Sequence, residues 1–551
     1  MPVINFSYRD LCSLMGADVP REELVERIPL IGADMHDEGD GSDEMSVEFF
    51  PDRPDLFSVE GLARALRAFL SIEPGLREYP VGPPLLEVSV DPGVKGVRPF
   101  FACAAVVGVG IDDALLRSMM ELQEKLHLTI GRKRAKLAIG IHDMDAVAPP
   151  FRYGVADPDG ASFAPLGHRE PMTLRGILSG HDKGREYAHL LDGFSEYPLI
   201  TDAEGRVLSF PPIINGALTA VTTNTRNVFI DVTGTDGKAV DGALNIVASA
   251  LAERGGEIRS VRVTGEGGRV SPDLSASERR VSASECGRFL GVPASPRDLA
   301  DALRRMGMGA EADGDSIAVR IPATRLDVMH DVDVFEDAAI GYGFERFGSR
   351  HPVAQTVGRL LPETAFSEKM RDVMIGLGFT EVSALTLSNE RDEFERSGLP
   401  ETGVVRLLNP VTEDHTCLRP YLMPGLMRIL RHNKHRDLPQ RIFEIGYAVR
   451  GGKASLRLCA LSASSKAPFS EIKSISESVL REAGAEFSLS PSDAAAFVPG
   501  RGASVASGGM EIGFFGEVSP EVVTSFDLSH PVSMFEADLS RIAAEKSGSL
   551  F

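Results

Sequence analysis

The sequence lacks any long hydrophobic run and any recognisable leader. Its longest apolar stretch, FFACAAVVGVGI at 100–111, is shorter than the roughly 18 residues that a membrane-spanning helix needs. The opening residues, MPVINF, do not have the charged and apolar regions of a signal peptide. We therefore expect a cytoplasmic protein with no membrane partner.

Cysteine is also scarce. The five cysteines include no C-x-x-C pair, which argues against a disulfide framework or a zinc ribbon as the basis of the fold. We expect buried thiols at Cys12, Cys103, Cys286, Cys417 and Cys459.

The common small-molecule motifs are missing too. GTDGKA at 234–239 has the wrong spacing for a phosphate-binding loop, and Gly108 and Gly110 lack the third glycine of a dinucleotide fingerprint. The sequence contains no H-E-x-x-H and no G-x-S-x-G. An enzyme with this sequence therefore has no compact catalytic signature.

Negative charge dominates what is present. With 79 acidic and 58 basic residues, the net charge is −21, so any attraction for nucleic-acid phosphates must be local. The densest basic stretch is GRKRAKL at 131–137. Its charges alone are typical of a solvated loop, with a local phosphate contact as the alternative.

Length and sequence pattern predict a multidomain α+β protein with four domains. Residues 1–84 form an N-terminal α+β domain that ends near the Pro/Gly-rich linker EYPVGPPLLE. Residues 85–262 alternate strand-like runs with two helical segments, which indicates a mixed α/β domain. Residues 268–345 contain two short helices and then a hairpin, and residues 350–551 alternate antiparallel strands with helices.

The third range has the order of elements found in winged-helix modules, which commonly read nucleic acid. It has too few exposed basic residues to read a groove. We therefore predict a winged-helix-like domain without DNA as a partner.

Small polar side chains are concentrated in the second range, between the turns DAEG and GTDG. Such groups either orient a polar ligand in a pocket or serve as turn and strand-edge residues, and the sequence leaves both possibilities open. They are Ser209, Asn215, Thr222, Thr223, Asn224, Thr225, Asn227, Asp231 and Thr233.

RLDVMHDVDVFEDAAIGYGF at 325–344 places five carboxylates within eleven positions. Acidic residues in the first turn of the helix that follows are favoured by the helix dipole. Asp327, Asp333, Glu336 and Asp337 are also spaced so that their oxygens can converge, as Mg²⁺ requires. From spacing alone, the dipole and metal interpretations are equally good.

Several segments resemble one family. They are PDRPDLFSVEGLARALRAFL, YPLITDAEGRVLSFPPIIN, TRNVFIDVTGTD, the D-x5-D-x2-E-D of 327–337, and VRLLNPVTEDHTCLRPYLMPGLMRILRHNKHRDLPQRIFEIG. In this order they resemble the β subunit of phenylalanine–tRNA ligase, in its shorter archaeal and eukaryotic form. The resemblance implies a tetramer of two α and two β chains that charges tRNA(Phe) with phenylalanine, using ATP and Mg²⁺.

The resemblance also assigns residues. It implies that Asp327, Asp333, Glu336 and Asp337 bind a Mg²⁺ shared with the α subunit. The second domain is similar to the family's editing domain, which hydrolyses tyrosine misattached to the transfer RNA. Arg134 would then meet phosphates of the acceptor end. The family's pocket positions are matched here by Gln123, Arg134, Ser209, Asn215, Asp231 and Thr233.

The last 200 residues resemble a class II synthetase core that lacks its catalytic motifs. RIFEIG at 441–446 keeps the strand but has Phe443 before Glu444, where an ATP-binding arginine is expected. PGRGASV at 499–505 lacks the pattern of the third motif. The resemblance therefore implies a catalytically silent core that packs against α, with the adenylation chemistry on the partner chain.

Two rival interpretations and one open question remain. An orphan relative that edits in trans would hydrolyse mischarged transfer RNA without a shared Mg²⁺. A winged-helix regulator would need a basic face, which the net charge of −21 disfavours. No His or Cys stands out as a general base, so the resemblance suggests that substrate positioning activates the hydrolytic water.

Overall fold

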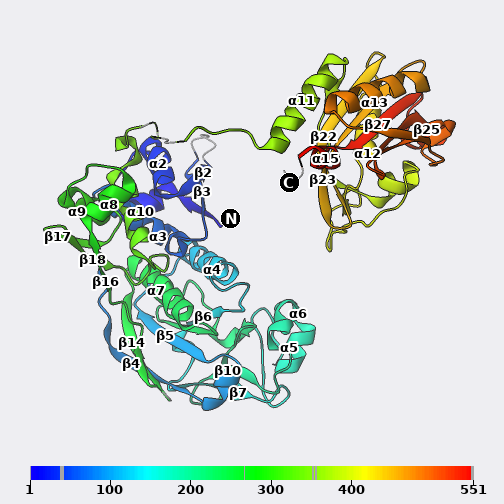
Figure 1. Cartoon of the computed structure of the whole chain (residues 1–551). Coiled ribbons are helices and arrows are strands. Elements are labelled where there is room, and N and C mark those ends of the chain that lie inside the picture. The colour runs from blue at the N-terminus through cyan, green and yellow to red at the C-terminus, as the bar shows by residue number, and fades with distance from the viewer. Residues whose placement is uncertain are drawn as a thin grey trace. The chain divides into compact units, whose positions relative to one another are not determined.

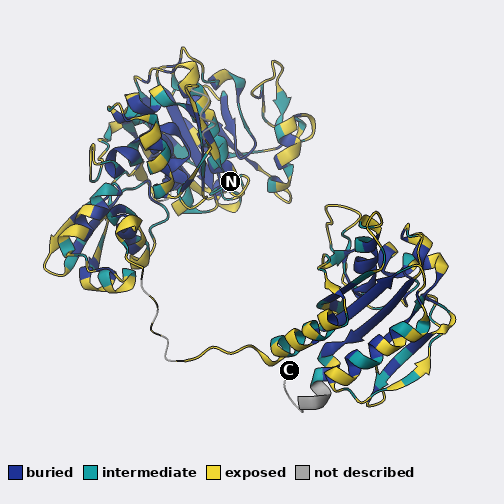
Figure 2. Cartoon of the chain, turned by 90° about the horizontal axis from the view of Figure 1, so that it is seen from above, coloured by how far each residue is buried: buried dark blue, intermediate teal, exposed yellow. Residues whose placement is uncertain are grey.

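The computed structural model describes residues 2–36, 42–265, 267–349, 351, 353 and 356–547. It divides into two compact units, Met1–His351 and Pro352–Phe551 (Figure 1). Each unit has a buried interior under an exposed surface (Figure 2). All five cysteines are buried and free, as the sequence predicts. Within the described residues, no helix combines the length and the apolar character needed to cross a membrane.

The first unit opens with a three-stranded antiparallel sheet in the order β1-β3-β2. Alternate residues of β1 and β3 are buried, because one face of this sheet packs on the core. Ser58 begins the helix α3, since its hydroxyl accepts the N–H of Gly61. The elements are β1 (Val3–Ser7), α1 (Tyr8–Met15), α2 (Arg21–Arg27), β2 (Ala33–His36), β3 (Glu44–Phe49) and α3 (Val59–Phe69).

A ten-stranded mixed sheet follows, in the order β12-β11-β10-β7-β4-β14-β5-β13-β6, with β15 beside β14. Helices α4 and α7 pack over β5, β6 and β13 (Figure 1). The strands are β4 (Gly82–Val90), β5 (Phe100–Val107), β6 (Leu137–Asp143), β7 (Phe151–Ala156), β10 (Tyr197–Thr201), β11 (Val207–Phe210), β12 (Ile214–Asn215), β13 (Val228–Gly234), β14 (Glu257–Thr264) and β15 (Arg269–Ser271). The helices are α4 (Asp113–Leu128), α5 (Leu174–Gly180), α6 (Asp182–Tyr187) and α7 (Gly237–Glu253), and β8 (Ser162–Phe163) pairs with β9 (Met172–Thr173).

A third sheet in this unit has the order β16-β18-β17. Ser282 and Ser295 cap the two short helices that precede its hairpin. The acidic stretch leads into a third helix, α10. The elements are β16 (Ser277–Ser282), α8 (Ala283–Leu290), α9 (Pro296–Arg305), β17 (Gly309–Asp313), β18 (Ser316–Ile321) and α10 (Asp331–Tyr342).

The second unit is built on a seven-stranded sheet in the order β19-β22-β23-β27-β26-β25-β24. All neighbours are antiparallel except β19 and β22. The strands are β19 (Thr380–Glu381), β22 (Gln440–Arg450), β23 (Lys453–Ala463), β24 (Ser488–Pro491), β25 (Phe497–Ser507), β26 (Met510–Val518) and β27 (Val532–Asp538), with a separate pair β20 (Leu387–Ser388) and β21 (Cys417–Leu418). The helices are α11 (Pro362–Gly376), α12 (Met423–His432), α13 (Phe469–Ala483), α14 (Pro520–Ser525) and α15 (Leu539–Ser547).

The mixed α/β, multidomain architecture expected from the sequence is therefore present. The four domain boundaries, the winged-helix-like description of 268–345 and the synthetase-like description of 350–551 stay predictions.

Candidate functional site

A cavity of about 480 Å³ lies between α4, β6 and the segment that follows β11. Apolar side chains such as Leu116, Met120 and Ile213 form part of its wall. The cavity also brings together five of the six pocket residues expected from the sequence. These are Gln123, Arg134, Ser209, Asn215 and Asp231.

Hydrogen bonds fix the amide and hydroxyl groups of this cavity. Gln123 on α4 donates from Nε2 to the carbonyl of Ile139 at 2.7 Å. Ser209 donates from Oγ to Oδ1 of Asn215 at 3.1 Å, and Asn215 donates from Nδ2 to the carbonyl of Ile141 at 3.4 Å. The polar groups are thus held on the edge of a sheet before any ligand binds.

Asp231 is held by a histidine that sequence analysis did not identify. His142 Nε2 lies 2.7 Å from Asp231 Oδ2, and its Nδ1 lies 2.7 Å from Thr219 Oγ1. Both side chains of the Asp231–His142 pair are at most 1% exposed. Gly140, opposite Asp231 in the ladder, leaves the space for this contact, because a Cβ there would lie 2.0 Å from Asp231 Oδ2.

Arg134 crosses one wall of the cavity. Its Nη1 donates to the carbonyls of Pro212 and Ile213 at 3.3 and 2.8 Å, and its Nη2 lies 3.3 Å from Glu124 Oε2. Its guanidinium also lies 4.5 Å from the ring centre of Tyr187. These contacts engage the side chain that the sequence assigns to acceptor-end phosphates.

The two histidines of the wall are engaged in backbone hydrogen bonds. His127 Nε2 accepts the N–H of Ile139 at 2.8 Å, and burial lowers the pKa of His127 to about 4. His181 Nδ1 accepts the N–H of Lys183 at 3.0 Å. Neither nitrogen is therefore a ready proton acceptor for a water molecule in the cavity.

Thr233 lies outside the cavity wall, two residues beyond Asp231 on β13. It is fully buried, and Arg98 donates to both its Oγ1 and its carbonyl, at 3.2 and 2.9 Å. Burial lowers the pKa of Arg98 to about 10. Thr233 therefore anchors an arginine under the sheet instead of facing a ligand.

The acidic stretch of 325–337 contains its own counter-ion. Arg325 Nη2 lies 2.6 Å from Asp327 Oδ2 and 2.6 Å from Asp337 Oδ2. Asp333 accepts the backbone N–H groups of Met329 and His330 at 2.7 and 2.6 Å and so caps α10. Capping and ion pairing together account for three of the four predicted metal ligands.

Glu336 is the fourth, and it lies in a field of like charge. Burial and then the charges of Asp337, Asp52, Asp333 and Asp327 raise its pKa. A hard cation with oxygen ligands would offset this repulsion, so the donor set fits Mg²⁺.

Ligand atoms nevertheless do not converge among these four carboxylates. Across the described residues, three such atoms lie within 4.8 Å of one another at Asp34, His36 and Glu48 instead.

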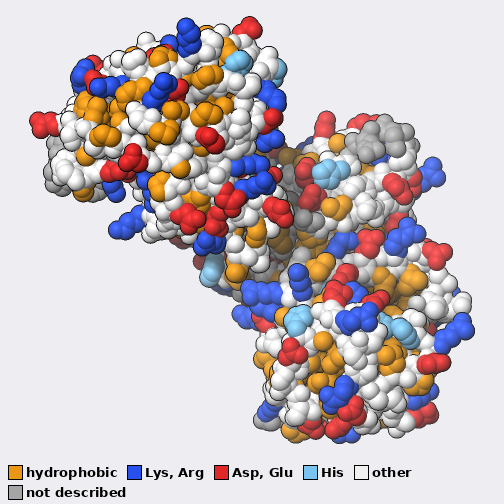
Figure 3. Space-filling model, turned by 90° about the vertical axis from the view of Figure 1, so that its right-hand side faces the viewer, with side chains coloured by type: hydrophobic (Ala, Val, Ile, Leu, Met, Phe, Trp, Pro, Cys, Tyr) orange, Lys and Arg blue, Asp and Glu red, His pale blue; other side chains and the backbone are white. Residues whose placement is uncertain are grey.

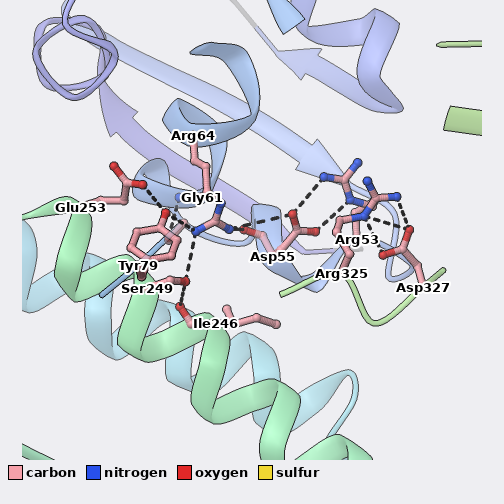
Figure 4. A network of polar contacts seen from close by, with 11 residues as sticks. Arg53, Asp55, Gly61, Arg64, Tyr79, Ile246, Ser249, Glu253, Arg325 and Asp327 are labelled. Atoms are coloured by element: carbon pink, nitrogen blue, oxygen red, sulfur yellow. Dashed lines mark hydrogen bonds and ion pairs between the residues drawn. The ribbon is translucent and has the colours of Figure 1, made fainter. Parts of the chain in front are cut away.

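A buried polar network connects this stretch to the rest of the first unit (Figure 4). Arg53 forms two hydrogen bonds to Asp55, at 2.8 and 2.9 Å, and Arg64 donates to the carbonyl of Asp55 and to Ser249. Burial raises the pKa of Asp55, but Arg53 and the other guanidinium groups outweigh burial and lower it to about 2. The acidic stretch, α3 and α7 are thus joined electrostatically.

In the second unit, the position expected to hold an ATP-binding arginine is part of the core. Phe443 is fully buried, and Glu444 beside it is paired with Arg419 at 2.8 Å.

Comparison with known proteins assigns the chain to a family. Residues 116–264 match the B3/4 domain, 279–344 the tRNA synthetase B5 domain, and 348–539 the phenylalanyl tRNA synthetase beta chain CLM domain. The chain is 47% identical to the phenylalanine–tRNA ligase beta subunit of Methanothrix thermoacetophila, over 98% of this chain and all of that protein. It belongs to the phenylalanine–tRNA ligase β-subunit family.

Other members of the phenylalanine–tRNA ligase β-subunit family agree with this assignment. The protein of that name from Methanococcoides burtonii is 43% identical over 98% of this chain and all of that protein. A crystallised N-terminal fragment of the phenylalanyl-tRNA synthetase beta subunit from Pyrococcus horikoshii is 41% identical, covers 62% of this chain and all of the fragment, and has a TM-score of 0.60. The family resemblance that the sequence motifs indicate is therefore confirmed.

The family domains also separate the two candidate sites of this β-subunit family member. The cavity lies almost wholly within the B3/4 match, and the acidic stretch lies within the B5 match. Sequence reasoning missed His142, Arg98 and Arg325. Only Arg325 had a sequence signal, since it stands two residues before Asp327.

Proposed function

We propose that this chain works with an α subunit, in a tetramer of two α and two β chains, to charge tRNA(Phe) with phenylalanine using ATP and Mg²⁺. We further propose that its cavity hydrolyses tyrosine misattached to that transfer RNA. The observation that carries the editing proposal is the cavity of about 480 Å³, in which Asp231 sits among fixed amide and hydroxyl groups and apolar side chains.

Recognition of the tyrosine hydroxyl is the task of Asp231 in this proposal. An apolar pocket rejects an analogue that carries one extra hydroxyl by only about 10²-fold, so a synthetic site alone admits some tyrosine. A carboxylate held at the end of a second pocket accepts a hydrogen bond from that hydroxyl. A phenylalanyl ester leaves the carboxylate without this bond, which favours hydrolysis of the tyrosyl ester.

Positioning, and not proton abstraction by a histidine, activates the water in this mechanism. His127 and His181 both accept backbone N–H groups, so they do not offer a free base. Asn215 and Ser209 then orient the ester relative to the water. We expect single substitutions of such residues to reduce hydrolysis only modestly.

Asp327, Asp333, Glu336 and Asp337 would hold the Mg²⁺ of the complex in this proposal. When bound, the ion supplies positive charge to a segment whose carboxylates repel one another. Arg325 holds Asp327 and Asp337 in place. The second unit, which lacks the expected arginine at Phe443, serves as a silent core that packs against α, where ATP is used.

The test is hydrolysis of tyrosyl- and phenylalanyl-tRNA(Phe) by the chain co-expressed with its α subunit. We expect selective loss of the tyrosyl ester. An Asn215→Ala variant should hydrolyse it about 10-fold more slowly, with unchanged phenylalanine charging. Asn224→Ala is the matched control, because Asn224 is exposed and outside the cavity wall.

Two results would contradict parts of this proposal. Survival of both esters while the tetramer still charges phenylalanine would leave the chain as a structural partner without an editing site. A loss above about 10³-fold in Asn215→Ala would indicate direct participation in proton transfer, since positioning effects of one hydrogen bond are smaller.

A further inference from the structure

Three consecutive residues beside the cavity have left-handed backbone. Arg132, Lys133 and Arg134 have φ angles of 45°, 53° and 66°. Side chains with a Cβ rarely adopt this region, because the Cβ crowds a carbonyl oxygen. Elsewhere in the described chain, only Ser71 and Asp527 among non-glycine residues have positive φ. Strain of this kind, concentrated in one turn, is typical of functional loops.

The turn is held in this conformation from both ends. At its start, the N–H of Gly131 donates to the carbonyl of Leu126 at the end of α4. At its end, the N–H of Lys136 donates back to the carbonyl of Gly131 at 2.9 Å. Between them, Arg134 fastens the turn to the cavity wall through the carbonyls of Pro212 and Ile213.

The fastened turn leaves Arg132 and Lys133 exposed. Neither side chain has a hydrogen-bond or ion-pair partner among the described residues. Nearby cations differ, since Lys136 pairs with Asp236 at 2.9 Å and Lys183 with Glu186 at 2.9 Å. Acidic and basic side chains are generally interspersed on the face shown in Figure 3. Two adjacent unpaired cations on a strained turn are therefore unusual in a chain with a net charge of −21.

We propose that the turn Arg132–Arg134 is a phosphate clamp, in which Arg132 and Lys133 contact backbone phosphates of the single-stranded acceptor end whose ester enters the adjacent cavity. The proposal rests on the proposed editing function. It assigns separate tasks to neighbouring residues, because Arg134 anchors the turn while the two preceding cations bind. Phosphate contacts position a nucleic acid without reading its sequence, as a site for a common CCA end requires.

The test uses an Arg132→Ala/Lys133→Ala double variant of the tetramer. For hydrolysis of tyrosyl-tRNA, we expect KM to rise about 10-fold with kcat within about 2-fold. The slope of log(kcat/KM) against log[salt] should become shallower by about 1.4, because two contacts to single-stranded phosphates are lost. Hydrolysis of a tyrosyl ester of adenosine, which has no phosphates, should be unchanged.

An Arg117→Ala/Arg262→Ala variant is the matched control, because both residues are exposed and outside the cavity wall. It removes the same charge and should change neither KM nor the salt slope. Equal effects of the two double variants would overturn the clamp and leave editing intact. If the wild-type tetramer hydrolyses no tyrosyl ester, editing fails instead, and the clamp is judged by binding of an RNA hairpin ending in CCA. Unchanged affinity of the double variant for that hairpin overturns the clamp.

A pair of single variants tests whether the strain belongs to the clamp. Lys133→Ala and Lys133→Gly remove the same charge, but only glycine relieves the left-handed backbone. Both should weaken the KM equally. The melting temperature should rise by about 2 °C in Lys133→Gly alone, and a rise in neither variant would show that the turn is not strained.

Discussion

Asp231 in the first unit and Glu393 in the second are both buried acids, but their surroundings are opposite. Asp231 lies 2.7 Å from His142, and Asp337, also in the first unit, lies 2.6 Å from Arg325. Neither carboxylate oxygen of Glu393 has a hydrogen-bond partner among the described residues. Burial raises the pKa of Glu393 to about 8. The first unit thus fixes buried carboxylates with partners, whereas the second keeps Glu393 protonated at neutral pH.

Replacing Arg325 by Met should have the largest effect. It leaves Asp337, which is 3% exposed, as a buried acid without its partner. Breaking a buried ion pair in this way costs about 3–5 kcal/mol. Hydrogen exchange measured by mass spectrometry on the α10 peptides would report this loss in their opening free energy.

The control for Arg325 is Arg279→Met. Arg279 pairs with Asp331 at 2.7 Å, but both side chains are substantially exposed. Exposed pairs contribute about 0–1 kcal/mol. Similar losses in the two variants would mean that burial does not set the importance of the partner.

Glu393→Gln tests the opposite environment through pH. Because the pKa of Glu393 is raised from 4.5 to about 8 on folding, its protonated form favours the folded state. That contribution is complete below about pH 4.5 and is lost as pH rises to 8. We expect the wild-type second unit to lose about 3 kcal/mol over this window.

The Glu393→Gln variant should not show this loss, because glutamine does not titrate. At pH 5 the two proteins should be similarly stable, and at pH 9 the variant should be the more stable. Hydrogen exchange of peptides around 389–397 at both pH values measures the difference. A wild-type stability that is flat between pH 5 and 9 would contradict a buried, protonated Glu393.

Gly140→Ala sharpens the comparison at Asp231. The new Cβ would lie 2.0 Å from Asp231 Oδ2 and 2.6 Å from His142 Nε2, so the pair must separate. Misplacement of a binding group by about 1 Å costs on the order of 10²-fold in rate. We expect tyrosyl-tRNA hydrolysis by the tetramer to fall about 100-fold, with phenylalanine charging unchanged.

Gly110→Ala is the control for this substitution, since a Cβ there meets no atom within 4 Å. It should leave hydrolysis at the wild-type rate. Hydrolysis within 2-fold of wild type in Gly140→Ala would show that the Asp231–His142 contact is dispensable.

Local features of the fold were readable in the sequence. Ser58, Ser282 and Ser295 each begin a helix, because a serine hydroxyl supplies the acceptor that the first free N–H groups need. The motif order also identified the family, and the family in turn indicated five residues that line one cavity.

Thr233 shows where this reasoning stops. Strand periodicity puts Thr233 on the same face as Asp231, two residues away on β13. The sequence does not reveal that Arg98, 135 residues earlier, occupies Thr233 from below the sheet. Contacts of such sequence separation depend on which strands become neighbours, and no local pattern records that choice.

The sequence by itself determined the helix starts, the acidic concentration of 327–337 and the family. Only the tertiary structure decided which polar groups meet. His142 reaches Asp231 because β6 and β13 pair in a register that places Gly140 opposite Asp231. Arg325 reaches Asp337 because α10 folds back on the turn after β18. The physical reason is that helix capping involves neighbours a few residues apart, whereas side-chain partners across a sheet depend on strand register and packing.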